Sequence, residues 1–70
     1  MSTNPEFLQT LRMPDVVKRT GLSRSTIYRA ESRGQFPKHV KIGEHASGWL
    51  AHEVDAFIAA RIAQRDKEAA

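Results

Sequence analysis

The sequence predicts a small, mainly α-helical domain of three helices and one β-hairpin, and three observations lead to that prediction. Apolar residues recur at helical spacing in three separate segments. Between the second and third of these segments the spacing changes to the alternation that is typical of a strand. The chain has 70 residues and no cysteine, which leaves room for one domain and no disulfide framework. The core is therefore expected to depend on helix and hairpin packing.

The domain is expected to span residues 11–65. Residues 1–10 are expected to form a flexible lead-in, because they are mostly polar and show no apolar period; Phe7 and Leu8 are the candidates to reach the core. Residues 66–70 are expected to fray. The first ten residues have no basic segment followed by an apolar one, and no apolar run approaches the roughly 20 residues of a membrane span. We therefore expect a cytoplasmic location and no membrane partner.

The first helix is expected between Leu11 and Gly21. Pro14 suits the first turn of a helix, and a neighbouring acidic residue, Asp15, favours its positive end. An apolar stripe, which includes Val16, supplies the buried face. Gly21 ends the helix, because glycine readily adopts the left-handed conformation that closes a helix.

A second helix is expected to follow at once, from Arg24 to about Arg33. Ser23 stands where a hydroxyl can accept hydrogen bonds from the first free N–H groups of that helix. Ile27 and Ala30 are expected to face the core, with Tyr28 at the edge of the buried face.

A hairpin is expected after the second helix. Residues 38–42 alternate polar and apolar side chains and form its first strand, and Trp49-Leu50 returns as the second. Residues 43–48 are small or polar, which favours a loose tip. Trp49 is expected to be a core residue rather than a wedge between nucleic-acid bases, because so small a domain depends on its largest apolar side chain.

The third helix is expected from about His52 to Gln64. Four apolar residues fall on one face of it, at Val54, Phe57, Ile58 and Ile62. The first turn carries acidic residues that the helix dipole explains. They point to different faces of the helix, so they do not form a catalytic carboxylate pair.

The charges are distributed unevenly along the chain. Residues 12–43 hold eight basic and two acidic side chains, whereas residues 44–70 hold three basic and five acidic ones. A basic segment beside an acidic one is expected of a module that docks on phosphates with one side. On charge alone, a merely solvated basic surface is the alternative.

Two short helices joined by a tight turn form a helix-turn-helix arrangement, in which the second helix can enter a major groove of DNA. The start of the second helix strengthens this interpretation, because its exposed side chains donate hydrogen bonds and no carboxylate occurs before Glu31. These donors are Arg24, Ser25, Thr26, Tyr28 and Arg29.

Four segments resemble those of a known family. They are LRMPDV at 11–16, TGLSRSTIYR at 20–29, FPKHVKIG at 36–43 and GWLAHEVDAFI at 48–58. Together they resemble the AlpA family of prophage transcriptional regulators. The resemblance covers about residues 11–65 and is far more specific than a bare helix-turn-helix.

The resemblance implies a winged helix-turn-helix domain, related to the MerR-like and excisionase-like DNA binders, with three helices and a two-stranded wing. In such a domain the second helix lies in the major groove and the hairpin wing lies near the minor groove. Carried over by position, the recognition segment comprises Ser23, Arg24, Ser25, Thr26, Tyr28 and Arg29.

The wing departs from the family pattern. Relatives often carry arginine before the tryptophan, whereas this chain has Glu44-His45-Ala46-Ser47. We therefore expect a weakened wing, in which His45 either donates to a phosphate or reaches a narrow minor groove. Lys38 and Lys41, on the polar face of the hairpin, are expected to contribute backbone contacts.

Neither an enzyme nor a metal site is predicted. The chain offers no paired nucleophile and base and no phosphate-binding glycine loop, and it has little mass to enclose a pocket. The three histidines have no neighbours in a ligand pattern. No cofactor is expected.

The leading functional hypothesis is a sequence-specific, double-stranded-DNA-binding transcriptional regulator of a prophage or other mobile element, located at the bacterial nucleoid. A second is an excisionase-like factor that bends attachment-site DNA and recruits an integrase. A third is a protein-interaction adaptor that uses the apolar face from Val54 to Ile62. Because one copy buries little surface, dimers or side-by-side binding are expected, with an integrase or RNA polymerase as possible protein partners.

Overall fold

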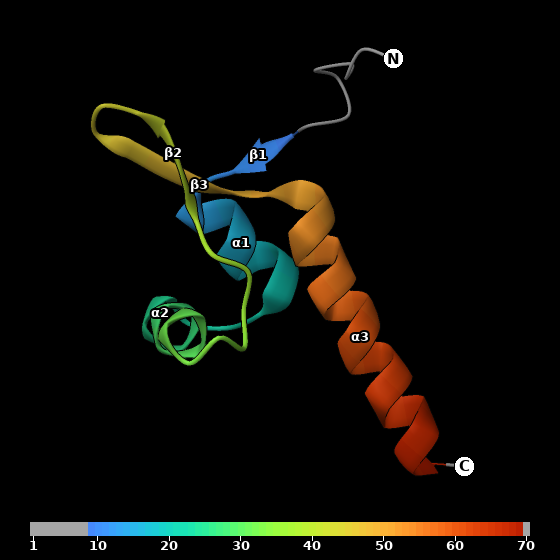
Figure 1. Ribbon diagram of the computed structural model, residues 1–70. Coiled ribbons are helices and arrows are strands. Elements are labelled where there is room, and N and C mark those ends of the chain that lie inside the picture. Colours follow the sequence, from blue (N-terminus) through green and yellow to red (C-terminus); the bar gives the residue numbers. More distant parts are fainter. Residues whose placement is uncertain (1–8, 70) are drawn as a thin grey trace.

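The structure, a computed structural model, describes residues 9–69 and confirms the predicted fold class of three helices and a small hairpin. Phe7 and Leu8, the expected core contacts of the lead-in, lie outside the described residues. The elements in chain order (Figure 1) are β1 (Thr10–Leu11), α1 (Met13–Thr20), α2 (Arg24–Ser32), β2 (Val40–Gly43), β3 (Ala46–Leu50) and α3 (Ala51–Ala69).

A short strand that the sequence did not predict completes the sheet. β1 pairs antiparallel with β3, so that Leu11 lies opposite Trp49, and the strand order is β1-β3-β2. Beyond the strand ends, the Ala51 N–H donates to the Gln9 carbonyl oxygen at 2.7 Å. Two residues are too few to show an alternating pattern, and their partner strand is distant in sequence, so local analysis could not find β1.

The hairpin is tighter than predicted. Its turn consists of Glu44 and His45 alone, and Ser47 and Gly48, expected in a loose tip, belong to β3. Position 48 requires glycine, because the side chain of Ile42 fills the space that a Cβ would occupy. We call the hairpin from β2 through β3 the wing.

The caps of the first two helices confirm the predicted turn. Gly21 adopts a left-handed conformation with φ of 74°, and its N–H donates to the Val17 carbonyl oxygen at 2.8 Å. The Ser23 hydroxyl accepts from the Thr26 N–H at 3.2 Å and so caps α2. These local hydrogen bonds set the path of the chain from α1 into α2.

The core lies where the sheet meets the three helices. Val16, Ile27 and Val54 are completely buried and come from α1, α2 and α3. Trp49 is 2% exposed, which confirms its predicted place in the core, and its indole N–H donates to the Pro37 carbonyl oxygen at 3.0 Å. Trp49 therefore contributes both the largest buried side chain of the core and a hydrogen bond.

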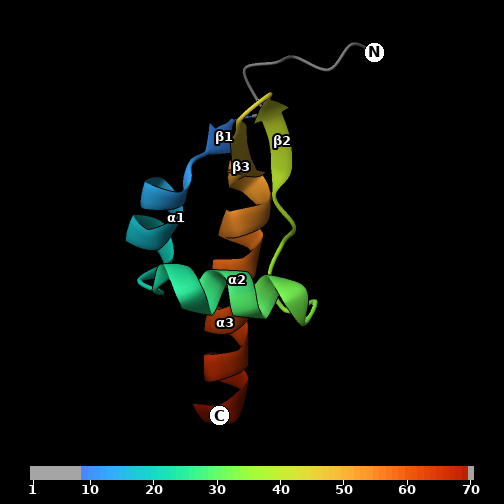
Figure 2. The ribbon, with the colours of Figure 1, turned by 90° about the vertical axis from the view of Figure 1, so that its left-hand side faces the viewer.

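The third helix is longer than predicted. It begins at Ala51, directly after β3, and continues past the expected end at Gln64 to Ala69, through the segment expected to fray. Residues 59–69 are all exposed, and this end of the helix extends away from the other elements (Figures 1 and 2). Alanine, arginine, glutamine, lysine and glutamate predominate there, and all favour helices without tertiary contacts.

The third helix carries too many polar residues for a transmembrane segment. Within residues 9–69, no helix combines the length and the apolar character needed to cross a bilayer.

We expect the Gly48→Ala substitution to destabilise the domain by about 1–3 kcal/mol, because overpacking displaces its neighbours. A Cβ at this position would lie 2.7 Å from the Leu11 carbonyl oxygen and 2.5 Å from Ile42 Cδ1. Gly43→Ala is the control in the same hairpin, since a Cβ there meets nothing within 4 Å. Urea denaturation measures both variants; equal stabilities would contradict the tight contact at position 48.

Candidate nucleic-acid interface

The second helix and the wing project to the same side of the molecule. This side lies to the left in Figure 1 and faces the viewer in Figure 2, where α2 runs across the view below the wing. Between them lies a groove of about 550 Å³, which we call the α2–wing groove. It is lined by Arg12, Met13, Pro14, Arg24, Tyr28, His45, Ser47 and Trp49. Three residues of the predicted site, Arg24, Tyr28 and His45, are thus brought to one groove.

The orientation of α2 follows from its apolar pattern. Ile27 is completely buried and Glu31, one turn later, is 8% exposed, so this stripe faces the core. The side chains exposed to solvent lie outside this stripe, and they include Arg24, Ser25 and Arg29. Since Glu31 is the one acidic residue of α2, the exposed face of the helix carries no carboxylate.

Tyr28 links the exposed face to the core. Its ring is tilted against the indole of Trp49, with the ring centroids 6.2 Å apart, and the residue is 47% exposed. The buried indole therefore fixes one side of the ring while the rest faces the α2–wing groove.

The hydroxyls of Ser23 and Thr26 have a structural role. Their oxygens are 2.8 Å apart, and the Ser23 oxygen also caps the helix. Thr26 is half-buried and lies on the side of α2 away from the α2–wing groove, toward α3. These two predicted residues are thus engaged with each other and separated from Arg24 and Tyr28.

The predicted wing residues occupy different places. His45 lies in the turn at the tip of the wing and lines the α2–wing groove. Lys41 is exposed and pairs with Ser47, and cross-strand partners share a face of the sheet. Lys38 was expected on the hairpin, but it precedes β2 and lines a separate hollow beside Glu53 of α3.

Sequence analysis did not assign Arg12 or Ser47 to the site. Arg12 is the N-cap residue of α1, makes no side-chain capping bond and lines the α2–wing groove. Its position in the basic half of the chain was a usable indication. Nothing in the sequence showed that Ser47 would lie on the groove side of β3.

A second missed feature joins α2 to the start of the wing. The buried Glu31 carboxylate accepts a hydrogen bond from the His39 N–H at 2.6 Å and lies 2.7 Å from His39 Nδ1. The two residues are eight positions apart, beyond the reach of helical spacing rules. Since His39 immediately precedes β2, this pair holds the wing in a fixed position relative to α2.

The α2–wing groove is basic, and within residues 9–69 its two arginines form no ion pair. The ion pairs of the described part of the chain join Arg19 to Asp55, His39 to Glu31 and Arg65 to Asp66. Arg12 and Arg24 take part in none of these pairs. Their guanidinium groups can therefore form bidentate hydrogen bonds with an external anion.

Comparison with known proteins agrees with this arrangement. The sequence model of the family described as "Prophage CP4-57 regulatory protein (AlpA)" matches residues 9–62. The chain belongs to this AlpA family. The description is that of a regulatory protein rather than of an enzyme family.

Two relatives of this AlpA-family chain are informative. One, named "DNA-binding transcriptional activator AlpA" in Escherichia coli (strain K12), is 31% identical over 64 residues, covering 83% of this chain and 91% of the relative. Another, "Uncharacterized protein ORF88" of Enterobacteria phage P4, is 47% identical over 57 residues. That match covers 81% of this chain but 65% of the phage protein, so the AlpA-type domain spans about two thirds of that relative.

We expect the Glu31→Ala substitution to cost about 1–3 kcal/mol, because it leaves the His39 N–H without its acceptor. Hydrogen exchange of the His39 amide should accelerate, which denaturant titration alone would not reveal. Ser32→Ala, at the next and exposed position, is the control and should change stability by no more than about 0.5 kcal/mol. Unchanged protection of the His39 amide in Glu31→Ala would show that this pair does not fix the wing.

Proposed function

We propose that this AlpA-family chain is a sequence-specific DNA-binding transcriptional regulator of a prophage or other mobile element. In this proposal α2 enters the major groove and the wing lies over the adjacent phosphate backbone. No enzymatic step is involved.

The observation that carries the proposal is the exposed face of α2. Arg24, Ser25, Tyr28 and Arg29 offer hydrogen-bond donors on this face, and the one carboxylate of the helix is buried against His39. The helix has nine residues and is about 14 Å long at 1.5 Å per residue. An α-helix with its side chains is about 10–12 Å across, so α2 fits a major groove about 12 Å wide, where arginine reads guanine through two hydrogen bonds.

The α2–wing groove supports separate roles for phosphate contacts and base contacts. Its lining includes two arginines, Arg12 before α1 and Arg24 of α2, together with His45 of the wing. With α2 in the major groove, this hollow would accept the phosphate backbone that borders it. Such contacts set the position and orientation of the protein, and base contacts from Arg24 and Arg29 would supply specificity.

The weakened wing remains part of the proposal. His45 faces the groove, but the neighbouring Glu44 brings a negative charge to the exposed tip. We therefore place the main wing contact on Lys41, whose strand partner Ser47 lines the groove.

The relatives favour regulation over the alternatives. The Escherichia coli relative is named a transcriptional activator, which supports a regulator rather than a recombination factor. As the sole function, the adaptor alternative needed a continuous free apolar face from Val54 to Ile62, but Val54 is completely buried and Phe57 and Ile58 are only partly exposed. The small size of the module favours binding as a dimer or side by side on repeated half-sites. RNA polymerase or an integrase would be the protein partner.

We expect Arg24→Ala and Arg29→Ala each to weaken specific DNA binding by about 1–3 kcal/mol, because each removes a base contact. Fluorescence anisotropy with a duplex from the chain's own upstream region and a scrambled duplex measures the effect. Arg65→Ala, on the free end of α3, is the control for loss of one positive charge. Specific affinity that survives both α2 substitutions would remove α2 from the role of recognition helix.

We expect Lys41→Ala to lower affinity for the specific and scrambled duplexes alike, because a phosphate contact carries no sequence information. The slope of log affinity against log salt should fall by about 1. Titrations at several salt concentrations measure that slope. A loss confined to the specific duplex would instead assign Lys41 to base recognition.

A further inference from the structure

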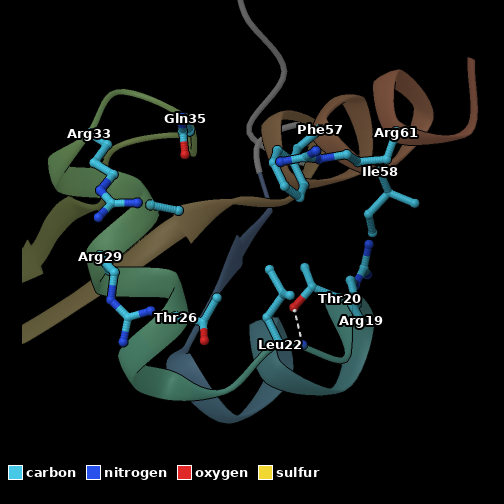
Figure 3. Close-up of a pocket in the computed structure, with 11 residues that line it drawn as sticks. Arg19, Thr20, Leu22, Thr26, Arg29, Arg33, Gln35, Phe57, Ile58 and Arg61 are labelled. Carbon is cyan, nitrogen blue, oxygen red and sulfur yellow. Dashed lines mark hydrogen bonds between the residues drawn. The ribbon is translucent and has the colours of Figure 1, made fainter. Parts of the chain in front are cut away.

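A second hollow lies on the other side of α2. Its walls are α2 and α3, and the end of α1 with the following turn closes one end of it (Figure 3). The volume is about 360 Å³, within the range of about 300–1,000 Å³ that is usual for ligand pockets. We call it the α2–α3 groove.

The floor of the α2–α3 groove is apolar. Leu22, Ala30, Phe57 and Ile58 line it, and each is only partly buried although it packs against the core. The Phe57 ring is fixed from below by Phe36, with the ring centroids 4.7 Å apart. The groove therefore offers a preformed apolar surface that the fold itself leaves partly uncovered.

Four arginines surround this floor. Arg29 and Arg33 come from the α2 side, Arg19 from the end of α1 and Arg61 from α3 (Figure 3). Arg19 is held by Asp55 at 2.7 Å. The guanidinium of Arg61 lies over the Phe57 ring, 5.0 Å from its centroid. Among the ion pairs of residues 9–69, none involves Arg29, Arg33 or Arg61.

From this combination we infer that the α2–α3 groove docks an acidic amphipathic segment of a partner protein. Bulky apolar side chains of that segment would cover Leu22 and Ile58, and its carboxylates would meet Arg33 and Arg61, the two rim arginines that neither pair with Asp55 nor are assigned to DNA. This is the helix-in-groove mode of recognition, with charge complementarity setting the orientation.

The chemistry of the groove favours a protein over the other occupants. A DNA backbone has no bulky aliphatic or aromatic side chain to insert against Phe57 and Ile58, so its phosphates and sugars would leave much of the floor uncovered. A second copy of this chain is a poorer match, because the acidic residues at the free end of α3, Asp66 and Glu68, alternate with basic residues, and Ile62 is the one bulky apolar residue in that end of the helix. The partner segment needs several carboxylates and at least one large aliphatic or aromatic side chain.

The test is a titration of the isotope-labelled full chain with a synthetic peptide, followed by amide chemical shifts. The peptide carries leucines at i and i+4 among aspartates and glutamates; a second peptide has serine in place of leucine. We expect the first peptide to shift the amides of Leu22, Ala30 and Ile58, and the serine peptide to bind more weakly by about tenfold. Absence of these shifts at millimolar peptide would overturn the inference.

Two variants separate docking from general charge attraction. Arg61→Glu reverses a charge on the rim, whereas Arg65→Glu makes the same change one turn further along α3, outside the groove. We expect Arg61→Glu to weaken the leucine peptide by about fivefold and Arg65→Glu to leave its affinity nearly unchanged. Equal effects of the two variants would contradict a defined site.

The same variants identify a different occupant. If Arg61→Glu weakens DNA binding and the peptide does not shift the amides of the groove, the groove belongs to the nucleic-acid interface and the inference fails. If the amides of the groove shift as the concentration of the chain alone is raised, a second copy fills it, and the inference fails in that case too.

Discussion

The fold depends on the burial of Trp49. Its indole contacts the rings of Tyr28, Phe36 and His39, with centroid distances of 6.2, 6.4 and 5.8 Å, and its N–H is bonded to the Pro37 carbonyl oxygen. The same residue lies opposite Leu11 in the sheet. A single side chain thus joins α2, the connection into the wing, and β1. In a domain with so little apolar surface, that junction holds α2 and the wing in one rigid arrangement.

The sequence predicted best those features that local rules govern. The cap at Ser23, the left-handed Gly21 and the inward face of Ile27 each depend on neighbours within about one helical turn, and all three were found. Trp49 was also assigned correctly to the core, because its size leaves few alternatives in a small domain. Its partners were not found, since they come from three different parts of the chain.

The missed features share a physical cause, which is contact between residues distant in sequence. The pairing of β1 with β3, the packing of Gly48 beneath Ile42 and the Glu31–His39 hydrogen bonds all need the tertiary fold to exist first. The candidate site shows the same division. Arg24 and Tyr28 were predicted from the exposed residues of one helix, whereas Arg12 joins them in the α2–wing groove only because α1 places its N-cap beside the wing.

The free end of α3 has a consequence for how the chain melts. Starting a helix is unfavourable, because several residues must be ordered before the first hydrogen bond forms, whereas adding residues to an existing helix is easy. Val54 and its buried neighbours supply that start, so residues 59–69 need only propagate it. Side-chain pairs such as Gln64 with Glu68, at 2.8 Å, add small increments. On heating, this end of α3 should therefore shorten turn by turn, whereas the rest of the domain unfolds in one cooperative step.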